Sequence, residues 1–81
     1  MEKQDSIAMR TKLLILMQKQ KFSTYTRLSI ILHIANLKPR EQGDNMVEDL
    51  IALIESGTTE QLFRNHTEGK YGVQMLSEQQ N

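Results

Sequence analysis

Hydrophobic and polar residues recur along the chain with the period of an α-helix. Apolar side chains cover about half of the helical wheel over residues 6–20 and form a narrower stripe over residues 45–56. Over residues 23–37 they cover roughly 240° of the wheel, far more than a surface helix needs. A shorter helix is expected over residues 59–65, whereas residues 66–81 show no sustained period and are expected to form a loose tail. The pattern predicts an all-α fold, a bundle of three to four helices with residues 23–37 at its centre.

Polar residues at the ends of these segments are suited to cap helices. The candidate N-caps, in chain order, are Asp5 or Ser6, Ser23 or Thr24, Asn45, and Thr58. Their side-chain oxygens can accept hydrogen bonds from the free N–H groups of a first helical turn. Glu48 and Gln61 each follow a candidate cap by three positions, which is the spacing of a capping box. We expect the second helix to end before Pro39 and the third to end near Gly57.

Length and composition limit the class of protein. The 81 residues are expected to form a single helical domain, and domains of this size often gain stability by oligomerising. The chain contains no cysteine, which excludes disulfide frameworks, zinc–cysteine sites and thiolate catalysis. A small secreted domain would normally need such cross-links, so the expected location is the cytoplasm. No stretch approaches the ~20 apolar residues of a transmembrane helix, so no membrane partner is expected.

The central segment combines a wide apolar surface with one uncharged polar stripe. The stripe consists of Thr26, Ser29, His33 and Asn36. Uncharged polar groups tolerate burial when they are hydrogen-bonded, whereas charged groups resist it. Because the neighbouring helices cannot cover so much apolar surface, we expect a homodimer packed through the central helix, or a regulatory protein bound to it. The predicted dimer or partner interface consists of Tyr25, Thr26, Leu28, Ser29, Leu32, His33 and Asn36.

Charge is distributed unevenly along a chain whose net charge is zero. Residues 1–40 contain eight Lys and Arg against two Asp and Glu, and residues 41–81 contain two against eight. Such asymmetry indicates either a basic nucleic-acid-binding half or attraction between the two halves. The second interpretation is favoured because the basic residues are dispersed. The candidate nucleic-acid contacts are Lys12, Lys19, Lys21, Arg27, Lys38, Arg40 and Arg64.

The alternative function is that of a DNA-binding transcriptional regulator. It would use the basic N-terminal half or a helix-turn-helix over residues 45–66. Side chains able to read base edges occur near the end of that range: Gln61, Arg64, Asn65 and His66. Acidic residues of the same range would oppose the DNA phosphates, namely Glu48, Asp49, Glu55 and Glu60. Nucleic acid is therefore an allowed partner but not the favoured one.

Groups suited to catalysis or metal binding are few. His33 and His66 lie 33 residues apart, and neither has the helical spacing to a second ligand that a metal site needs. Ser29 lies one turn before His33, but no glycine-built oxyanion loop or orienting acid accompanies the pair. The pattern is typical of a protein that is not an enzyme and has no cofactor, metal or small-molecule substrate.

The order of several segments resembles a known family. An apolar helix leads into Phe22-Ser23, a second ends at Leu37-Lys38, and a polar link precedes Asp49-Leu50-Ile51, with Ile54 three residues later. Over residues 10–55 this order resembles the small enterobacterial proteins of the biofilm-development, two-component connector family. The resemblance implies a small, all-helical, dimeric regulator that binds a signalling protein or DNA and has no active site. We therefore expect a dimerising modulator of a signalling or transcription factor.

Overall fold

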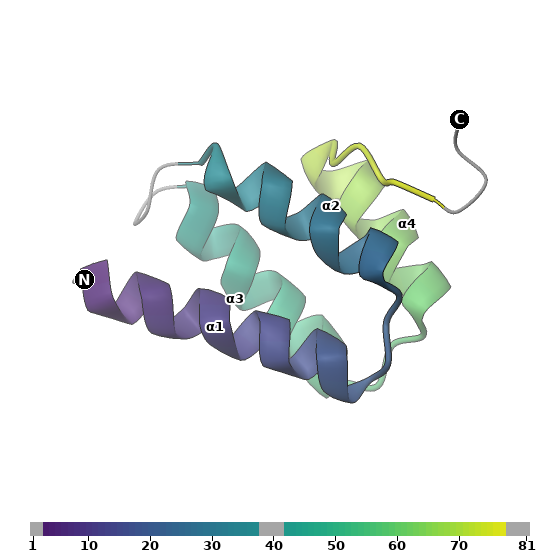
Figure 1. Cartoon of the computed structure of the whole chain (residues 1–81), viewed down its shortest axis with the longest axis horizontal. Coiled ribbons are helices and arrows are strands. Elements are labelled where there is room, and N and C mark those ends of the chain that lie inside the picture. The colour runs from purple at the N-terminus through teal and green to yellow at the C-terminus, as the bar shows by residue number, and fades with distance from the viewer. Residues whose placement is uncertain (1–2, 38–41, 78–81) are drawn as a thin grey trace.

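The computed structural model describes residues 3–37 and 42–77 (Figure 1). Within these residues it contains no strand and four helices, which are α1 (Lys3–Lys19), α2 (Thr24–Ala35), α3 (Gln42–Glu55) and α4 (Glu60–Tyr71). The predicted all-α fold is confirmed, but the prediction that residues 23–37 form its central helix is wrong, because α3 contributes five residues to the buried core and α2 only two. The helices expected over residues 6–20, 23–37 and 45–56 correspond to α1, α2 and α3, with ends shifted by one to three residues. None of the four helices is both long and apolar enough to cross a bilayer.

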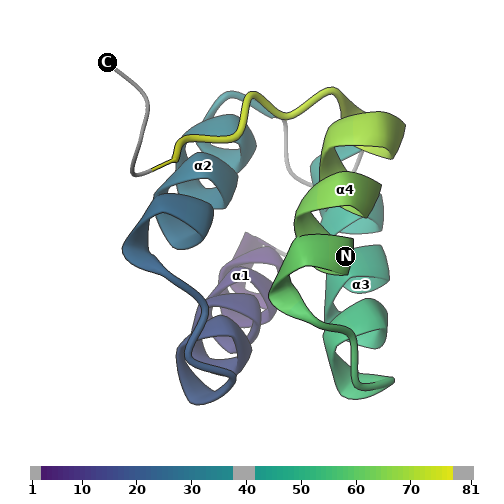
Figure 2. The same cartoon turned by 90° about the vertical axis from the view of Figure 1, so that its right-hand side faces the viewer.

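The helices lie in two orientations around a shared interior. α1 and α3 pack side by side and run in the same direction, whereas α2 runs back in the opposite direction (Figure 1). α4 packs against α3. After α4 the chain turns back, and residues 72–77 cross from α4 to α2 (Figure 2). We call these six residues the C-terminal strap, and with α1 they flank α2 on two sides.

The core forms where apolar side chains of all four helices meet. Its buried members are Leu13, Met17, Phe22, Ile30, Ile34, Met46, Val47, Leu50, Ile51, Ile54, Phe63 and Val73. α3 contributes five of them, in agreement with its apolar stripe. Phe22 and Phe63 connect the α1–α2 turn to α4, and their ring centroids lie 5.1 Å apart in a tilted arrangement. Removing this apolar surface from water supplies the main driving force for folding.

Three helix ends follow the sequence prediction. Ser23 caps α2, because its side-chain oxygen accepts a hydrogen bond of 3.3 Å from the N–H of Thr26. Gly57 follows α3 with a left-handed φ of 95°, and its N–H donates to the carbonyl of Ile54 over 3.0 Å. α2 ends at Ala35, before the proline, as expected.

Two other predicted caps are wrong. Asp5 and Ser6, the two candidates for the first helix, both lie inside α1, which begins at Lys3, and Asn45 lies inside α3, which begins at Gln42. The Ser6 hydroxyl instead donates to the buried carboxylate of Asp44, so it joins α1 to α3 rather than ending a helix. Asp44 lies in the first turn of α3, where a negative charge favours the helix terminus. The charge of Asp44 therefore favours a helix that begins before Asp44 rather than at Asn45.

α4 begins one residue later and ends six residues later than predicted. Its cap is Thr59 rather than Thr58, since the Thr59 hydroxyl accepts a 3.2 Å hydrogen bond from the N–H of Leu62. The helix continues to Tyr71, where Gly72 closes it with a left-handed φ of 66°. Residues 66–71, which extend α4 beyond the predicted end, include few apolar residues, so the hydrophobic pattern of the sequence shows no helical period there.

The prediction of a loose tail is wrong for residues 66–77, and residues 78–81 lie outside the described residues. Val73 of the strap is only 1% exposed and belongs to the core. The N–H of Leu76 donates to the Ser29 hydroxyl of α2 over 2.8 Å. The strap is therefore part of the packed fold, held by one apolar anchor and by hydrogen bonds that periodicity does not reveal.

Candidate functional site: an exposed apolar face on helix α2

One side of α2 presents apolar side chains to solvent. Tyr25, Leu28, Ile31 and Leu32 are 40, 42, 39 and 57% exposed, and we call them the outer face of α2. They follow one another at helical spacing, and no charged side chain lies between them on that side. The opposite side of α2 buries Ile30 and Ile34 in the core. The sequence carried this signal, because apolar residues cover more of the helix than the rest of the chain can bury.

Two hollows border the outer face. A groove of about 170 Å³ separates α2 from α1 and is lined by Arg10, Leu13, Leu14, Ile31, Ile34 and Ala35. A recess of about 230 Å³ separates α2 from the strap and is lined by Ser29, Leu32, His33, Asn36, Val73, Gln74 and Leu76. We call them the α1-side groove and the strap-side recess. The outer face is thus a ridge between two hollows, a shape that suits packing of ridges into grooves.

The seven residues predicted for the interface divide into two groups. Tyr25, Leu28, Leu32 and Asn36 are exposed, and His33 is half-buried at the strap-side recess. Thr26 and Ser29, in contrast, are buried within the chain itself, at 0 and 3% exposure. For these two residues the predicted role in an intermolecular interface is corrected, because α4 and the strap occupy their polar groups.

Thr26 lies at the centre of a polar cluster between α2 and α4. Its hydroxyl donates to Glu60 and accepts a 2.7 Å hydrogen bond from Nη1 of Arg64. Glu60 also accepts hydrogen bonds of 3.0 Å from the backbone N–H and the hydroxyl of Ser23. Nη2 of Arg64 donates to the carbonyl of Leu76 over 2.6 Å. The cluster therefore joins the start of α2, the start of α4 and the strap.

The pKa of Glu60 reflects this environment. Burial alone would raise the pKa, but hydrogen bonds from Thr26 and Ser23 and the positive charge of Arg64 lower it below the usual 4.5. The carboxylate thus stays ionised and its acceptor sites are filled by the protein's own donors. This arrangement is suited to holding helices together rather than to proton transfer.

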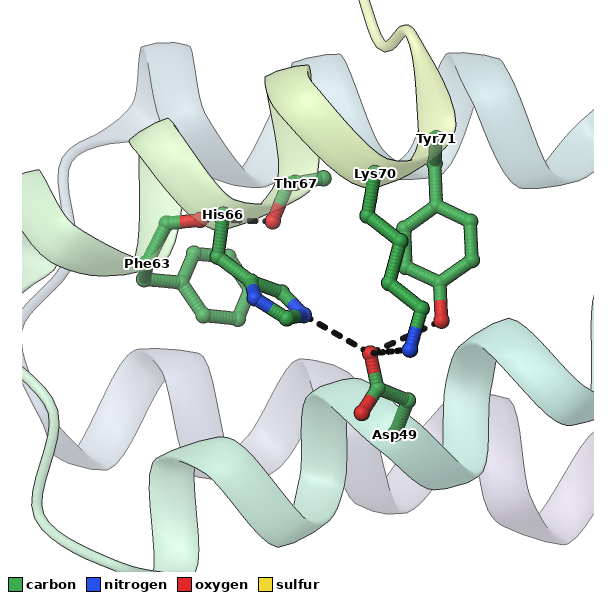
Figure 3. A network of polar contacts seen from close by, with 6 residues as sticks. All are labelled: Asp49, Phe63, His66, Thr67, Lys70 and Tyr71. Atoms are coloured by element: carbon green, nitrogen blue, oxygen red, sulfur yellow. Dashed lines mark hydrogen bonds and ion pairs between the residues drawn. The ribbon is translucent and has the colours of Figure 1, made fainter.

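A second polar cluster joins α3 to the last turn of α4 (Figure 3). Oδ2 of Asp49 lies 2.8 Å from Nε2 of His66 and accepts a 2.7 Å hydrogen bond from the Tyr71 hydroxyl. Nζ of Lys70 lies 3.5 Å from the same oxygen. Burial raises the pKa of Asp49, but the bonds from His66 and Tyr71 and the charge of Lys70 outweigh it, so the pKa lies below 3.8. Burial and the bond to Asp49 raise the pKa of Tyr71 to about 12.

This second cluster explains the length of α4. His66 and Lys70 are four residues apart and therefore share the side of α4 that faces Asp49. His66, a candidate base-reading residue at the edge of the predicted loose tail, lies inside α4 and contacts Asp49. The spacing of His66, Lys70 and Tyr71 was the available signal, but it identifies no partner until α3 is placed beside α4.

Three of the candidate nucleic-acid contacts are engaged by other side chains or the backbone of the chain itself. Lys12 pairs with Glu55 over 3.4 Å, and Arg64 is engaged in the α2–α4 cluster. Nη2 of Arg27 donates to the Thr24 hydroxyl over 3.2 Å. Lys19 and Lys21 are exposed near the α1–α2 turn, whereas Lys38 and Arg40 lie outside the described residues. Of the base-reading candidates, Gln61 and Asn65 bond to each other over 3.0 Å.

Within residues 3–37 and 42–77, no group of three or more His, Cys, Asp and Glu side chains is arranged to hold a metal ion. Comparison of the chain with protein-family models, curated protein sequences and solved structures gave no match. The candidate site is the outer face of α2 with its two bordering hollows.

Proposed function

We propose that the protein is a small non-enzymatic regulator that acts by association, and that it forms a homodimer through the outer face of α2. The observation that carries the proposal is this face itself, which is apolar, uncharged and open to solvent over the length of the helix. Other large exposed apolar residues, Ile7, Ile15 and Leu62, are scattered over α1 and α4. Scattered residues of this kind are ordinary, whereas a continuous face favours a partner.

A second copy of the chain is the partner that this face fits best. An isologous dimer needs a surface that is complementary to itself, and the ridge of Leu28 and Leu32 lies beside the strap-side recess. The ridge of one copy would enter the recess of the other, and the converse contact would form by symmetry. His33 and Asn36 line that recess and would supply uncharged polar contacts.

Light scattering of the purified protein at tens of micromolar tests the proposal. A mass of two chains is expected, and a strict monomer at this concentration would contradict it. The resemblance to the biofilm-development, two-component connector family supports a role as a modulator of a signalling or transcription factor. The absence of cysteine is consistent with action in the cytoplasm.

The second candidate function is DNA binding by the basic N-terminal half. It is favoured by one observation, namely that residues 6–40 contain no Asp or Glu. A gel-shift titration with duplex DNA at low and at moderate salt tests it, because phosphate contacts weaken strongly as salt rises. Binding at low salt that disappears at moderate salt would support it. No shift even at low salt would exclude it.

A further inference from the structure

The hairpin of α1 and α2 combines an exposed apolar groove with an excess of positive charge. Residues 6–37 contain Arg10, Lys12, Lys19, Lys21 and Arg27 but no Asp or Glu. Among the side chains that the structure describes, every carboxylate lies on α3 or α4. The α1-side groove is therefore an apolar hollow in a cationic surface, so a partner with apolar and acidic side chains would complement it.

The groove has room for a branched aliphatic side chain. Its floor and walls are Leu13 and Leu14 of α1 and Ile31, Ile34 and Ala35 of α2. Its volume of about 170 Å³ is comparable to the ~150 Å³ apolar cavity that can hold a benzene molecule. α1 and α2 run antiparallel (Figure 1), and the groove is lined by side chains of both helices, an arrangement in which an amphipathic helix can place its apolar side chains.

One arginine lines this groove, and a second lies one helical turn beyond its lining residues on α2. Arg10 lines the groove beside the end of α2, where Nη2 donates to the carbonyl of Leu37 over a long 3.4 Å. Arg27 lies one turn before Ile31 and on the same side of α2. A carboxylate of a partner would form a charge-assisted hydrogen bond with either guanidinium, and such bonds are stronger than those between neutral groups.

We propose that the α1-side groove binds an acidic amphipathic helix of the protein that this chain regulates. The span from Arg27 to Leu37 is ten residues, or about 15 Å along α2 at 1.5 Å per residue. A helix that binds in the groove is therefore expected to carry two acidic residues about eleven positions apart, one for each arginine. Two aliphatic residues lie between them, four and seven positions after the first acidic residue. These four positions share one side of an α-helix. The aliphatic residues enter the groove, and the carboxylates meet Arg10 and Arg27.

The shape of the site favours a protein helix over an anionic membrane or a nucleic acid. A bilayer surface is recognised by apolar side chains that protrude, whereas the lining of this groove is recessed between two helices. Single-stranded nucleic acid is bound on aromatic side chains, and the groove lining is aliphatic. The inference rests on the proposed mode of action by protein association, but not on the homodimer. The groove borders Ile31, on the α1 side of the ridge formed by Leu28 and Leu32.

A designed peptide provides the probe. Its helix carries Glu at positions i and i+11, Leu at i+4 and i+7, and alanine or glutamine elsewhere, with a fluorescent label at one end. A scrambled peptide of the same composition is the control for charge and hydrophobicity. Fluorescence anisotropy measures binding to the full chain, and vesicles with about 30% phosphatidylserine test the membrane alternative in parallel.

Matched substitutions locate the site. Ala35→Leu fills the groove from an exposed position, and Ala52→Leu adds the same side chain at an exposed position of α3. Arg10→Gln removes one guanidinium, and Lys19→Gln removes an exposed charge elsewhere on α1. Circular dichroism verifies that each variant is folded. We expect the dissociation constant to rise at least about 10-fold for Ala35→Leu and about 5-fold for Arg10→Gln, and to change less than about 2-fold for both controls.

Several results would overturn the inference. They are no binding up to about 500 µM peptide, equal binding of the scrambled peptide, or equal effects of the groove and control substitutions. Binding to the anionic vesicles that depends on Ala35 and Arg10, without peptide binding, would assign the surface to lipid instead. Light scattering on the same samples keeps the homodimer separate. A wild-type chain that dimerises but does not bind the peptide overturns only the groove, and a wild-type monomer that binds the peptide overturns only the dimer.

Discussion

Replacing Thr26 by valine removes one hydroxyl from the α2–α4 contact and keeps the shape of the side chain. That hydroxyl donates to Glu60 and accepts from Arg64, and Thr26 is fully buried. Hydrogen bonds to charged groups contribute about 1.5–3 kcal/mol each. Glu60 keeps both donors of Ser23, and Arg64 keeps the Leu76 carbonyl, so part of the loss is recovered. We expect Thr26→Val to lower the free energy of unfolding by about 2–3 kcal/mol.

Urea unfolding followed by circular dichroism measures this change. A domain of this length has a total stability of roughly 4–12 kcal/mol at 0.05–0.15 kcal/mol per residue, so the loss is a large fraction. Thr11→Val is the matched control, because Thr11 is exposed on α1 and its replacement should change stability by less than about 0.5 kcal/mol. Measurements at two protein concentrations separate folding from dimer formation.

The result also distinguishes two roles for Thr26. If its hydroxyl acts within the chain, the loss for Thr26→Val is the same at both protein concentrations. A loss no larger than that of Thr11→Val would refute the role of the polar cluster in stability. A loss seen only at the higher concentration would return Thr26 to the dimer interface predicted from the sequence.

Three further predictions concern the core and the α3–α4 cluster. Phe63→Ala should lower the free energy of unfolding by about 3–5 kcal/mol, because Phe63 is fully buried against Phe22; a loss below about 1 kcal/mol in urea unfolding would contradict this packing. Because the pKa of Asp49 is depressed when folded, its contacts stabilise the fold above pH 3.8 and are lost as pH falls through the folded pKa. Asp49→Asn should therefore lower stability at about pH 6 and flatten its decline below about pH 4, and an unchanged acid limb in urea unfolding would contradict this. The pKa of Tyr71 is raised to about 12, so its contribution is complete below the usual value of 10 and is lost as pH rises toward 12. Absorbance titration should show Tyr71 ionising above its ordinary range in the wild type and closer to 10 in Asp49→Asn, and identical titrations would exclude the hydrogen bond.

Helices with a clear apolar stripe were predictable from the sequence. α2 has a serine cap and a following proline, and α3 has a regular stripe and a closing glycine, so each has local signals for its position. α4 has neither a long stripe nor apolar residues in its last turns. Its length depends on Asp49, which lies 17 residues before His66 and 22 before Tyr71. Contacts of this kind are absent from local periodicity, and the helix was therefore predicted too short.

The candidate site was predicted only in part, again because contacts between residues that are distant in the sequence leave no local pattern. The wide apolar surface of α2 indicated an exposed face, and Tyr25, Leu28 and Leu32 are exposed in the structure. The uncharged character of Thr26 and Ser29 indicated burial, which is also found. The sequence does not show which group covers these two hydroxyls, because a second copy of the chain and a distant part of the same chain can each supply the hydrogen-bond partner. The groove depends on how α1 lies against α2, which no local pattern specifies.

Sedimentation equilibrium of the wild type, Leu32→Glu and Leu62→Glu at several concentrations tests whether the chain dimerises through the outer face of α2. Leu32 lies on the outer face, and Leu62 on α4 is similarly exposed, at 57 and 60%. A dimer through the outer face would bury the carboxylate introduced by Leu32→Glu in both copies without a partner charge, which is strongly unfavourable. We expect a dimeric wild type, a dissociation constant raised at least about 100-fold by Leu32→Glu, and little change for Leu62→Glu. A monomeric wild type, or equal effects of the two substitutions, would contradict association through this face.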